Sequence, residues 1–472
     1  MMAQALPASL RASLPASLPV SAGPVIVGLG GLIAVALVLT SPLIAAVLLP
    51  AALAGLILMR QPFLGLCMLI ALSHVDAVAN RLSDYSPIGI IKLLTFGTFA
   101  VALLAHSTRS SRQAFRQTQP TPSVPFVILF ILAMVLSFLF CQYEDAGQDH
   151  MVGFLGTIIL FFLTIYLTDT QQKLYILIGI LLFTGIFSSA IMVFETVVDV
   201  RLISRADAAI TAQWSGQARS SGASDFNPTT AAHMVLATTV IAAVMFLEGK
   251  RFKLITGIVA GLGCLAIGMT FARSALIGLV VVSIALAWPH RKHRLFPLAI
   301  AFLGLCAFAA LPFIPEAYWE RFGSLFNASA DQTLDRRLSY NLIGLQLFRE
   351  NPIIGIGPGN FPLHFIDHEF RWFPGRGTIP RQLHNTYLQV FVEYGILGAA
   401  MFLLALLTAV RAAFAAGKQE DPQAATVARA VGFAFIAFLI ASTFMPNEDT
   451  KFMWILPGLC VAAWRLSHRR AE

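Results

Sequence analysis

The sequence predicts an all-α fold: a polytopic bundle of about 12–14 transmembrane helices, with a large, partly helical loop before the last three. Composition is the first observation that predicts it. Hydrophobic residues make up 57% of the chain and charged residues 12%, and the mean hydropathy is +0.76, whereas soluble domains carry about 25% charged residues. Length is the second, because the apolar residues fall into about fourteen runs, and a helix needs about 20 such residues to cross a bilayer.

The order of these runs predicts the domain organisation. Prolines in the repeated LPASL of the first residues interrupt the apolar core that a cleaved signal peptide needs, so we expect a disordered tail there. The predicted parts are a cytoplasmic tail (1–23), a bundle of about eleven spans with an outer loop at 199–228 (24–314), a large periplasmic loop (315–394), three further spans (395–465) and a second cytoplasmic tail (466–472).

Basic residues in the short loops predict how the bundle is oriented. If both termini are cytoplasmic, the basic clusters around Arg112, Arg251, Lys292 and Arg469 all lie inside, as the positive-inside rule requires. The two long polar insertions then lie on the outer side. Because the basic residues are dispersed among short loops, the net charge of +8 indicates orientation and no nucleic-acid partner.

The spacing of cysteine and histidine does not indicate a metal site. No two of the five cysteines form a CxxC pair, and we interpret them as small buried residues. His364 and His368 have the spacing of metal ligands on a helix, but no third ligand is visible in the sequence, so we predict no metal and no cofactor. Asp76, Glu195 and His233 could form a proton path through the bundle, although each lies near the end of its run, where water can reach it.

The stretch 336–398 contains most of the candidate chemistry. Its first part alternates charged and apolar residues at helical spacing and should end at Asn351-Pro352, because the residue before a proline is disfavoured in a helix. Residues 354–361 then place three glycines and a proline in a turn. A second helix is expected to begin near His384 and to continue into the membrane, which would hold that histidine at the membrane surface.

Four motifs of this stretch form a recognisable pattern. They are Arg337, Pro352-Ile-Ile-Gly355-Ile-Gly357, His384-Asn385-Thr-Tyr387 and Glu393-Tyr-Gly395-Ile-Leu-Gly398. The pattern resembles the shared region of the O-antigen ligase and O-antigen polymerase (WaaL/Wzy-type) family of bacterial membrane glycosyltransferases. The resemblance covers about sixty residues; elsewhere it is limited to hydropathy, length and loop placement. It implies an inner-membrane location and a metal-independent transfer that inverts the anomeric centre.

His384 is the predicted catalytic residue, because the motif histidine of the family falls at this position. Glycosyl transfer requires an acceptor hydroxyl that loses its proton as it attacks the anomeric carbon, and a neutral imidazole suits that general-base role. On the residues alone, a histidine that caps the second helix is the open alternative. Glu393, nine residues on, would lie on the opposite side of a continuous helix and should not orient His384 directly.

Arginines of the outer loops are predicted to bind the donor diphosphate, because guanidinium groups donate paired hydrogen bonds and stay charged. Arg273 lies alone between two apolar runs, which indicates either a functional site or a side chain that snorkels to the headgroups. Arg219 precedes the Asn227-Pro228 start of a span, where backbone amides could face an anion. Alternatively, the loop acids pair with these arginines in a solvated cap. The candidates are Arg273 and Arg337 as catalytic residues with His384, and Arg219, Arg336, Arg376, Arg381, Asn385 and Tyr387 as substrate-binding residues.

The resemblance implies a periplasmic-face glycosyltransferase whose donor is an undecaprenyl-diphosphate-linked glycan. A ligase would transfer the glycan to lipid A core or to a protein, and a polymerase would transfer it to another lipid-linked repeat of O-antigen or exopolysaccharide. Other polysaccharide assembly proteins are further candidate partners. A transporter or flippase of lipid-linked glycans is the alternative, but such proteins place charge near the bilayer midplane, whereas this chain concentrates it in one outer loop. A scaffold for an export complex is the third possibility.

Overall fold

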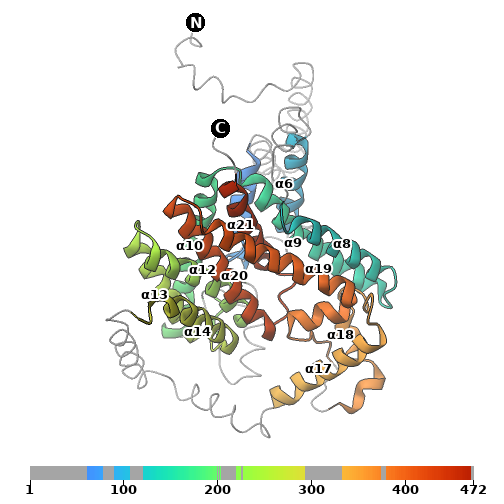
Figure 1. The fold of residues 1–472 in the computed structure, drawn as a ribbon. Helices are drawn as coiled ribbons and strands as arrows, with labels where there is room; N and C mark the ends of the chain where they lie inside the picture. The colour runs from blue at the N-terminus through green and yellow to red at the C-terminus, as the bar shows by residue number, and fades with distance from the viewer. Residues whose placement is uncertain are drawn as a thin grey trace, which may run out of the picture. The chain divides into compact units, whose positions relative to one another are not determined.

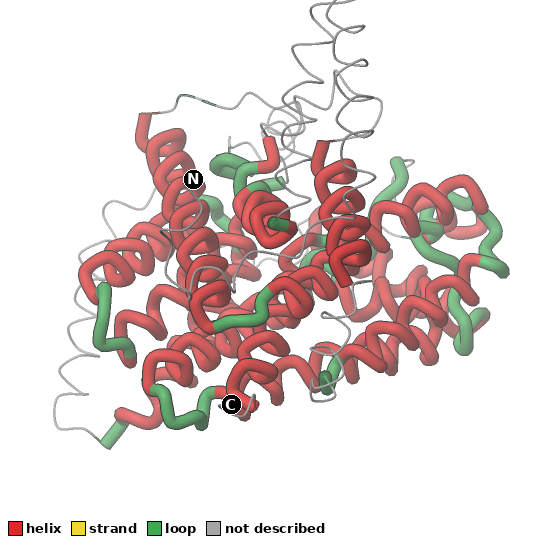
Figure 2. Tube along the Cα trace, turned by 90° about the horizontal axis from the view of Figure 1, so that it is seen from above, coloured by secondary structure: helices red, strands yellow, loops and turns green. Residues whose placement is uncertain are grey.

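The chain folds into helices throughout the part that the structure describes, which confirms the predicted all-α class (Figure 1). The computed structural model describes residues 61–77, 90–106, 121–198, 200, 202, 219–224, 227–292, 332–373 and 379–468. Among these residues no strand occurs, and Figure 2 shows helices joined by loops. The predicted tail 1–23, the first two predicted spans and the span predicted near 295–314 lie outside the described residues.

The described helices lie between residues 62 and 468. They are α4 (Pro62–Ala71), α6 (Ile90–His106), α8 (Val124–Phe138), α9 (Glu144–Leu167), α10 (Gln171–Val198), α12 (Pro228–Glu248), α13 (Lys253–Met269), α14 (Arg273–Ala287), α17 (Gln332–Glu350), α18 (Phe361–His364), α19 (Thr386–Ala416), α20 (Pro422–Ala441) and α21 (Lys451–His468), with the short 3-10 helices η1 (Trp288–His290), η4 (His368–Trp372) and η5 (Ser442–Phe444).

In the described part of the chain, five helices are long and apolar enough to cross a membrane, judged by length and composition: α9, α10, α12, α19, and α20 together with η5. The shorter apolar helices, with 10–17 residues, are α4, α6, α8, α13 and α14. The chain is therefore a multi-pass helical membrane protein. The number of spans stays a prediction, because several predicted spans fall outside the described ranges.

Helices α12, α20 and α21 form the interior of the bundle. α21 packs against α9, α19 and α20, and α12 packs against α13 and α20. Every residue of α21 from Phe452 to Ala463 is buried, as is most of α12. By contrast, α13 and α14 expose rows of leucine, isoleucine and valine, such as Leu254 and Ile284. Exposed apolar faces of this kind suit helices that meet lipid.

Side-chain caps mark the starts of α12, α19 and α20. Asn227, Asn385 and Asp421 accept hydrogen bonds from the first backbone N–H groups of α12, α19 and α20. At α12 and α20 a proline follows the cap. Proline lacks a backbone N–H, and at the first position of a helix that group would have no partner within the helix. Because Asn385 caps α19, the alternative interpretation of His384 as the capping residue is wrong.

The region before α19 has a hydrophobic core of its own. Tyr340 and Ile343 of α17 pack there with Phe361, Phe365 and Leu383, in a cluster distinct from the main core of the bundle. α17 ends at Glu350, where the following Asn-Pro pair predicts it to end, and it packs against α19. This second core therefore holds α17 against the start of α19.

A break at Gly395 divides α19, so the predicted helix does not run on into the membrane without interruption, although it is continuous from Thr386 to Tyr394. Gly395 has φ 61° and ψ −169°, a conformation essentially restricted to glycine. The turn after α17 supplies new partners: the N–H of Ile396 donates to the Pro352 carbonyl (2.9 Å), and the N–H of Gly357 donates to the Glu393 carbonyl (3.0 Å). Backbone groups freed from a helix at membrane depth need such partners, because lipid offers none.

Candidate functional site

His384 lies directly before the cap of α19, in a conformation that few residues adopt. Its φ is 52°, in the left-handed region, which costs a residue with a side chain about 1–2 kcal/mol. The centre of its ring lies 5.5 Å from the ring centre of Tyr340 on α17. Its Nδ1 atom is buried and has no hydrogen-bond partner among the described residues. A strained backbone and an unused ring nitrogen together indicate a functional histidine.

Two arginines lie close enough to His384 to change its protonation. The pKa of His384 is lowered from 6.5 to about 4, mainly by burial and to a smaller extent by the positive charges of Arg337 and Arg381. The imidazole is therefore neutral at pH 7 and able to accept a proton. The structure thus brings together three of the residues that the sequence singles out, one from α17 and two from the segment before α19.

The loop that carries His384 is fastened to the helix that follows it. The backbone N–H of Leu383 donates to Gln389 Oε1 (3.0 Å), and Gln389 Nε2 donates to Glu393 Oε1 (2.5 Å). The other carboxylate oxygen, Glu393 Oε2, accepts from the N–H of Gly359 (3.0 Å). Glu393 thus supports the His384 loop through Gln389, a link that the sequence analysis missed.

Arg219 and Arg273 lie around the turn between α13 and α14. Arg219 donates from Nε to the Thr270 carbonyl (2.6 Å) and from Nη2 to Thr229 Oγ1 (3.2 Å), so it ties the end of α13 to the start of α12. Arg273 is the first residue of α14, and it is exposed. A positive charge at a helix N-terminus adds to the helix dipole, and the two together attract an anion.

A buried chain of hydrogen bonds joins the start of α14 to the start of α19. Ser274 Oγ lies 2.7 Å from His233 Nε2, and His233 Nδ1 lies 2.9 Å from Asn447 Nδ2. The backbone N–H of Asn447 then donates to Thr386 Oγ1 (2.8 Å). The starts of α14 and α19 therefore lie at the same end of the bundle.

The connection between α20 and α21 contains polar residues that the sequence analysis missed. Glu448 is fully buried, and neither of its carboxylate oxygens has a hydrogen-bond partner in the described part of the chain. Burial, together with the charges of Asp449 and Glu393, raises the pKa of Glu448 well above its usual range. The available signal was the polar run Asn447-Glu448-Asp449 between two apolar runs on the predicted outer side.

The remaining predicted site residues are engaged elsewhere or lie outside the described part. Asn385 accepts from the N–H groups of α19, and the Tyr387 hydroxyl donates to the Leu439 carbonyl (2.7 Å). Arg376 lies outside the described residues, and so does the side chain of Arg336. Roles of these four residues toward a substrate stay predictions.

Other ionisable residues that the sequence singles out have partners in the structure. His364 Nδ1 lies 3.0 Å from a carboxylate oxygen of Asp367. Glu195 accepts a hydrogen bond from Ser220 Oγ (2.5 Å). Across the described ranges, no group of three or more histidine, cysteine, aspartate or glutamate side chains could hold a metal ion.

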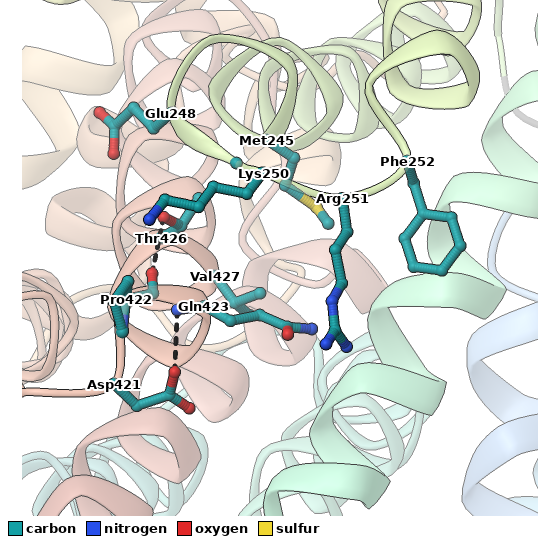
Figure 3. Close-up of a pocket in the computed structure, with 11 residues that line it drawn as sticks. Met245, Glu248, Lys250, Arg251, Phe252, Asp421, Pro422, Gln423, Thr426 and Val427 are labelled. Atoms are coloured by element: carbon teal, nitrogen blue, oxygen red, sulfur yellow. Dashed lines mark hydrogen bonds between the residues drawn. The ribbon is translucent and has the colours of Figure 1, made fainter.

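A pocket of about 210 Å³ lies at the other end of α12 and α20 (Figure 3). Figure 3 shows Lys250 and Arg251, from the α12–α13 turn, extending toward Gln423 and Thr426 near the start of α20. Each of these two helices is about 30 Å long, at 1.5 Å per residue, and its opposite end carries the hydrogen-bond chain described above. The pocket is therefore remote from His384, and the candidate active site is the cluster around His384.

A comparison with known families agrees with this location. Residues 257–403 match the family model described as O-antigen ligase. This match covers 147 of the 472 residues, so a region of the chain is similar to the O-antigen ligase family. The matched region contains Arg273, Arg337 and His384 and ends shortly after the break in α19. No curated protein matches the chain significantly.

The match supports a glycan ligase or polymerase type of function, in a membrane, between a lipid-linked glycan and an acceptor. The match extends from α13 to the middle of α19, so both helix starts of the candidate site belong to the matched region. Arg219, His233 and Asn447 lie outside it.

Proposed function

We propose that this protein is an outer-face glycosyltransferase that takes its glycan from an undecaprenyl-diphosphate-linked donor. The observation that carries the proposal is the state of His384. Its imidazole is neutral, sits on a strained backbone, and lies beside the guanidinium groups of Arg337 and Arg381. A base next to two forked cations suits a substrate pair in which a hydroxyl attacks and a charged diphosphate leaves.

The reaction exchanges one bond at the anomeric carbon of the donor glycan. The acceptor hydroxyl oxygen attacks this carbon and forms the new glycosidic bond, while the bond to the diphosphate oxygen breaks and its electron pair leaves with the diphosphate. His384 accepts the hydroxyl proton, and arginines stabilise the charge on the departing undecaprenyl diphosphate. Attack from the face opposite the leaving group inverts the anomeric centre. Arg337 and Arg381 are the candidates whose charges act on His384, and Arg273 and Arg219 are the candidates from the α13–α14 side.

The proposed location is the bacterial inner membrane, with both termini in the cytoplasm and His384 facing the periplasm. The positive-inside distribution of the short loops supports this orientation. A ligase would use lipid A core or a protein as acceptor, and a polymerase would use a second lipid-linked repeat. Both break the same bond from sugar to diphosphate, so the cluster around His384 serves either.

The test is His384→Ala in a strain that lacks the endogenous gene. A general base contributes about 100-fold or more to rate, so we expect surface glycan to be lost and the lipid-linked donor to accumulate. His368→Ala is the matched control, because His368 is an exposed histidine of the same region and should leave transfer intact. Normal transfer by His384→Ala at wild-type expression would overturn the proposal.

The species that accumulate in the deletion strain separate the candidate functions. Lipid A core without O-chain indicates a ligase, and core with a single repeat indicates a polymerase. Loss of a secreted polymer alone indicates an exopolysaccharide enzyme. A flippase would instead leave the lipid-linked donor in the cytoplasmic leaflet, which distinguishes transport from transfer.

A further inference from the structure

We propose that Asn447 is a positioning residue of this site. Together with His233, it fixes the start of α19 relative to the start of α14. Because His384 lies at the start of α19 and Arg273 at the start of α14, the link sets the position of His384 relative to Arg273. The catalytic roles of His384 and Arg273 rest on the proposed function, whereas the link between the two helix starts rests on buried hydrogen bonds. Neither Asn447 nor His233 lies within the matched region 257–403.

The donor and acceptor of each hydrogen bond in this network follow from the partners of Ser442 at one end. Ser442 Oγ donates to the Phe438 carbonyl (2.7 Å), so its oxygen accepts from Asn447 Nδ2 (2.9 Å). The same amide nitrogen faces His233 Nδ1 (2.9 Å), which must therefore accept. His233 then carries its proton on Nε2 and donates it to Ser274 Oγ (2.7 Å). One neutral tautomer of His233 thus satisfies both neighbours.

The backbone of Asn447 is tied to α19 as firmly as its side chain is tied to α12. Its N–H donates to Thr386 Oγ1 (2.8 Å), and the Thr386 hydroxyl donates to the Met445 carbonyl (2.8 Å). The backbone N–H of Thr386 donates to the same carbonyl (3.1 Å). Thr386 is the first residue of α19 and follows His384 by two positions. Asn447 consequently joins α12, α19 and the α20–α21 connection, and His233 extends the link to α14.

This link lies in the interior of the protein, where water cannot replace it. Asn447 and His233 are 0% exposed, and Ser274 is 6% exposed. Removing the Asn447 amide would leave the acceptor atoms of His233 and Ser442 without donors, and buried groups in that state favour rearrangement of the helices that carry them. The segment that carries Asn447, still bonded to Thr386 through its backbone, would then be free to shift with the start of α19 against α12 and α14.

A positioning role and a merely structural role predict different kinetics. If Asn447 only stabilised the fold, its loss would lower the amount of folded protein and leave the kcat of each folded molecule unchanged. Displacement of a base by about 1 Å can cost about 100-fold in rate. We therefore expect Asn447→Ala to lower kcat by about 10–100-fold, with little change in the KM for the lipid-linked donor.

Spin-label distances in the purified full chain test the link without any need for transfer. Labels at Ile277→Cys on α14 and Gln382→Cys before α19, in a background without the native cysteines, report the separation of the two helix starts. We expect Asn447→Ala, and equally His233→Ala, to broaden or shift the distance distribution. Thr239→Ala is the matched control, because Thr239 is a buried α12 residue whose hydroxyl bonds only within its own helix, and it should leave the distribution unchanged.

The outcomes are distinct. A broader distribution with lower kcat, and no further loss in the double variant of Asn447 and His233, supports the link, because members of one network are not additive. An unchanged distribution in Asn447→Ala overturns it, and so do additive losses in the double variant. Ser274→Ala removes one hydrogen bond of the same network by deleting a single hydroxyl group. It takes the place of Asn447→Ala if that variant does not fold. If the wild-type protein transfers no glycan, the proposed function fails, while the distances still decide on the link.

Discussion

The surroundings of His384 determine how transfer should depend on pH. Burial, with Arg337 and Arg381 alongside, lowers the pKa of His384 from 6.5 to about 4, and a general base works only when it is unprotonated. We expect kcat/KM to fall only as the pH approaches about 4, the pKa of the free protein. A bound diphosphate offsets the arginine charges and raises this pKa, so kcat should fall at a higher pH than kcat/KM. Rate profiles at low and at saturating donor measure both.

Arg381→Gln is the control for this pH dependence. Removing one positive charge beside His384 should move the acid limb of kcat/KM to higher pH, because a like charge disfavours the protonated ring. The arginine charges do not act on His384 if two results are found together. In the wild type, the acid limbs of kcat and kcat/KM would lie at the same pH, and in Arg381→Gln neither limb would move.

Glu448 should make the protein less stable as the pH rises. Burial and the carboxylates of Asp449 and Glu393 raise the pKa of Glu448 well above 4.5. Above pH 4.5 this carboxyl group loses its proton in the unfolded chain but keeps it in the folded protein. The free energy of unfolding therefore falls with increasing pH. Glu448→Gln removes the titration and keeps the shape, so its melting temperature should equal or exceed that of the wild type, with a gap that widens between about pH 5 and about pH 8. A lower melting temperature at the alkaline end would show that an ionised carboxylate is needed.

At the scale of single residues, the sequence could identify the chemistry but not its surroundings. The motif pattern predicts His384 and Arg337, and the structure places them together. Gln389, Asn447 and Glu448 could not be predicted in the same way. Their neighbours lie on other helices or on the opposite side of a turn, and only the packed structure brings them within hydrogen-bond distance or leaves them without a partner.

The broken helix α19 depends on glycine at one position. A side chain at Gly395 would adopt a conformation that costs about 1–3 kcal/mol and would overlap the Ile353 carbonyl. We expect Gly395→Ala to lose at least about 2 kcal/mol of stability and much of its transfer activity, because the break joins the His384 segment to the turn after α17. Thermal unfolding and transfer assays measure the two effects.

Gly261→Ala in α13 is the matched control for this change. No atom lies within 4 Å of a Cβ built at Gly261, and alanine favours a helix over glycine by about 1 kcal/mol. The control should be neutral or slightly stabilised. Equal stability of the two alanine variants would show that the break does not constrain the backbone.

At the scale of elements, the sequence predicts helix ends where prolines and caps mark them. α17 ends before Asn351-Pro352, and α20 begins with Pro422 after the Asp421 cap. The apolar run that predicts a span begins at Gly395, but this change in hydropathy does not distinguish a break from a helix that continues into the membrane. The hydrogen-bond partners at the break lie about forty residues earlier in the chain, so the break could not be predicted from local sequence.

The orientation of the whole molecule can be measured directly. Trp372, in the region before α19, is 79% exposed, and Phe252, in the α12–α13 turn, is 66% exposed. In a background without native cysteines, a membrane-impermeant maleimide should label Trp372→Cys in cells with a permeabilised outer membrane. Phe252→Cys should react only after the inner membrane is lysed. The reverse pattern would put His384 in the cytoplasm and contradict the proposed function.

Composition alone is sufficient to predict the membrane class of the molecule, whereas the count of spans is harder to predict. α8 and α14 have 15 residues each, fewer than the roughly 20 that cross a bilayer. α21 has Pro457 in its interior and basic residues near both ends. Such helices are surrounded partly by protein, so their sequences are not selected for lipid contact along the whole length.

The enclosure of α21 bears on how the molecule is made. Among the helices described, it leaves the ribosome after all the others, yet α9, α19 and α20 pack around it. Before α21 is in place, these neighbours lack the helix that packs among them. We therefore expect the nascent chain to be more vulnerable to proteolysis before α21 is inserted than after it.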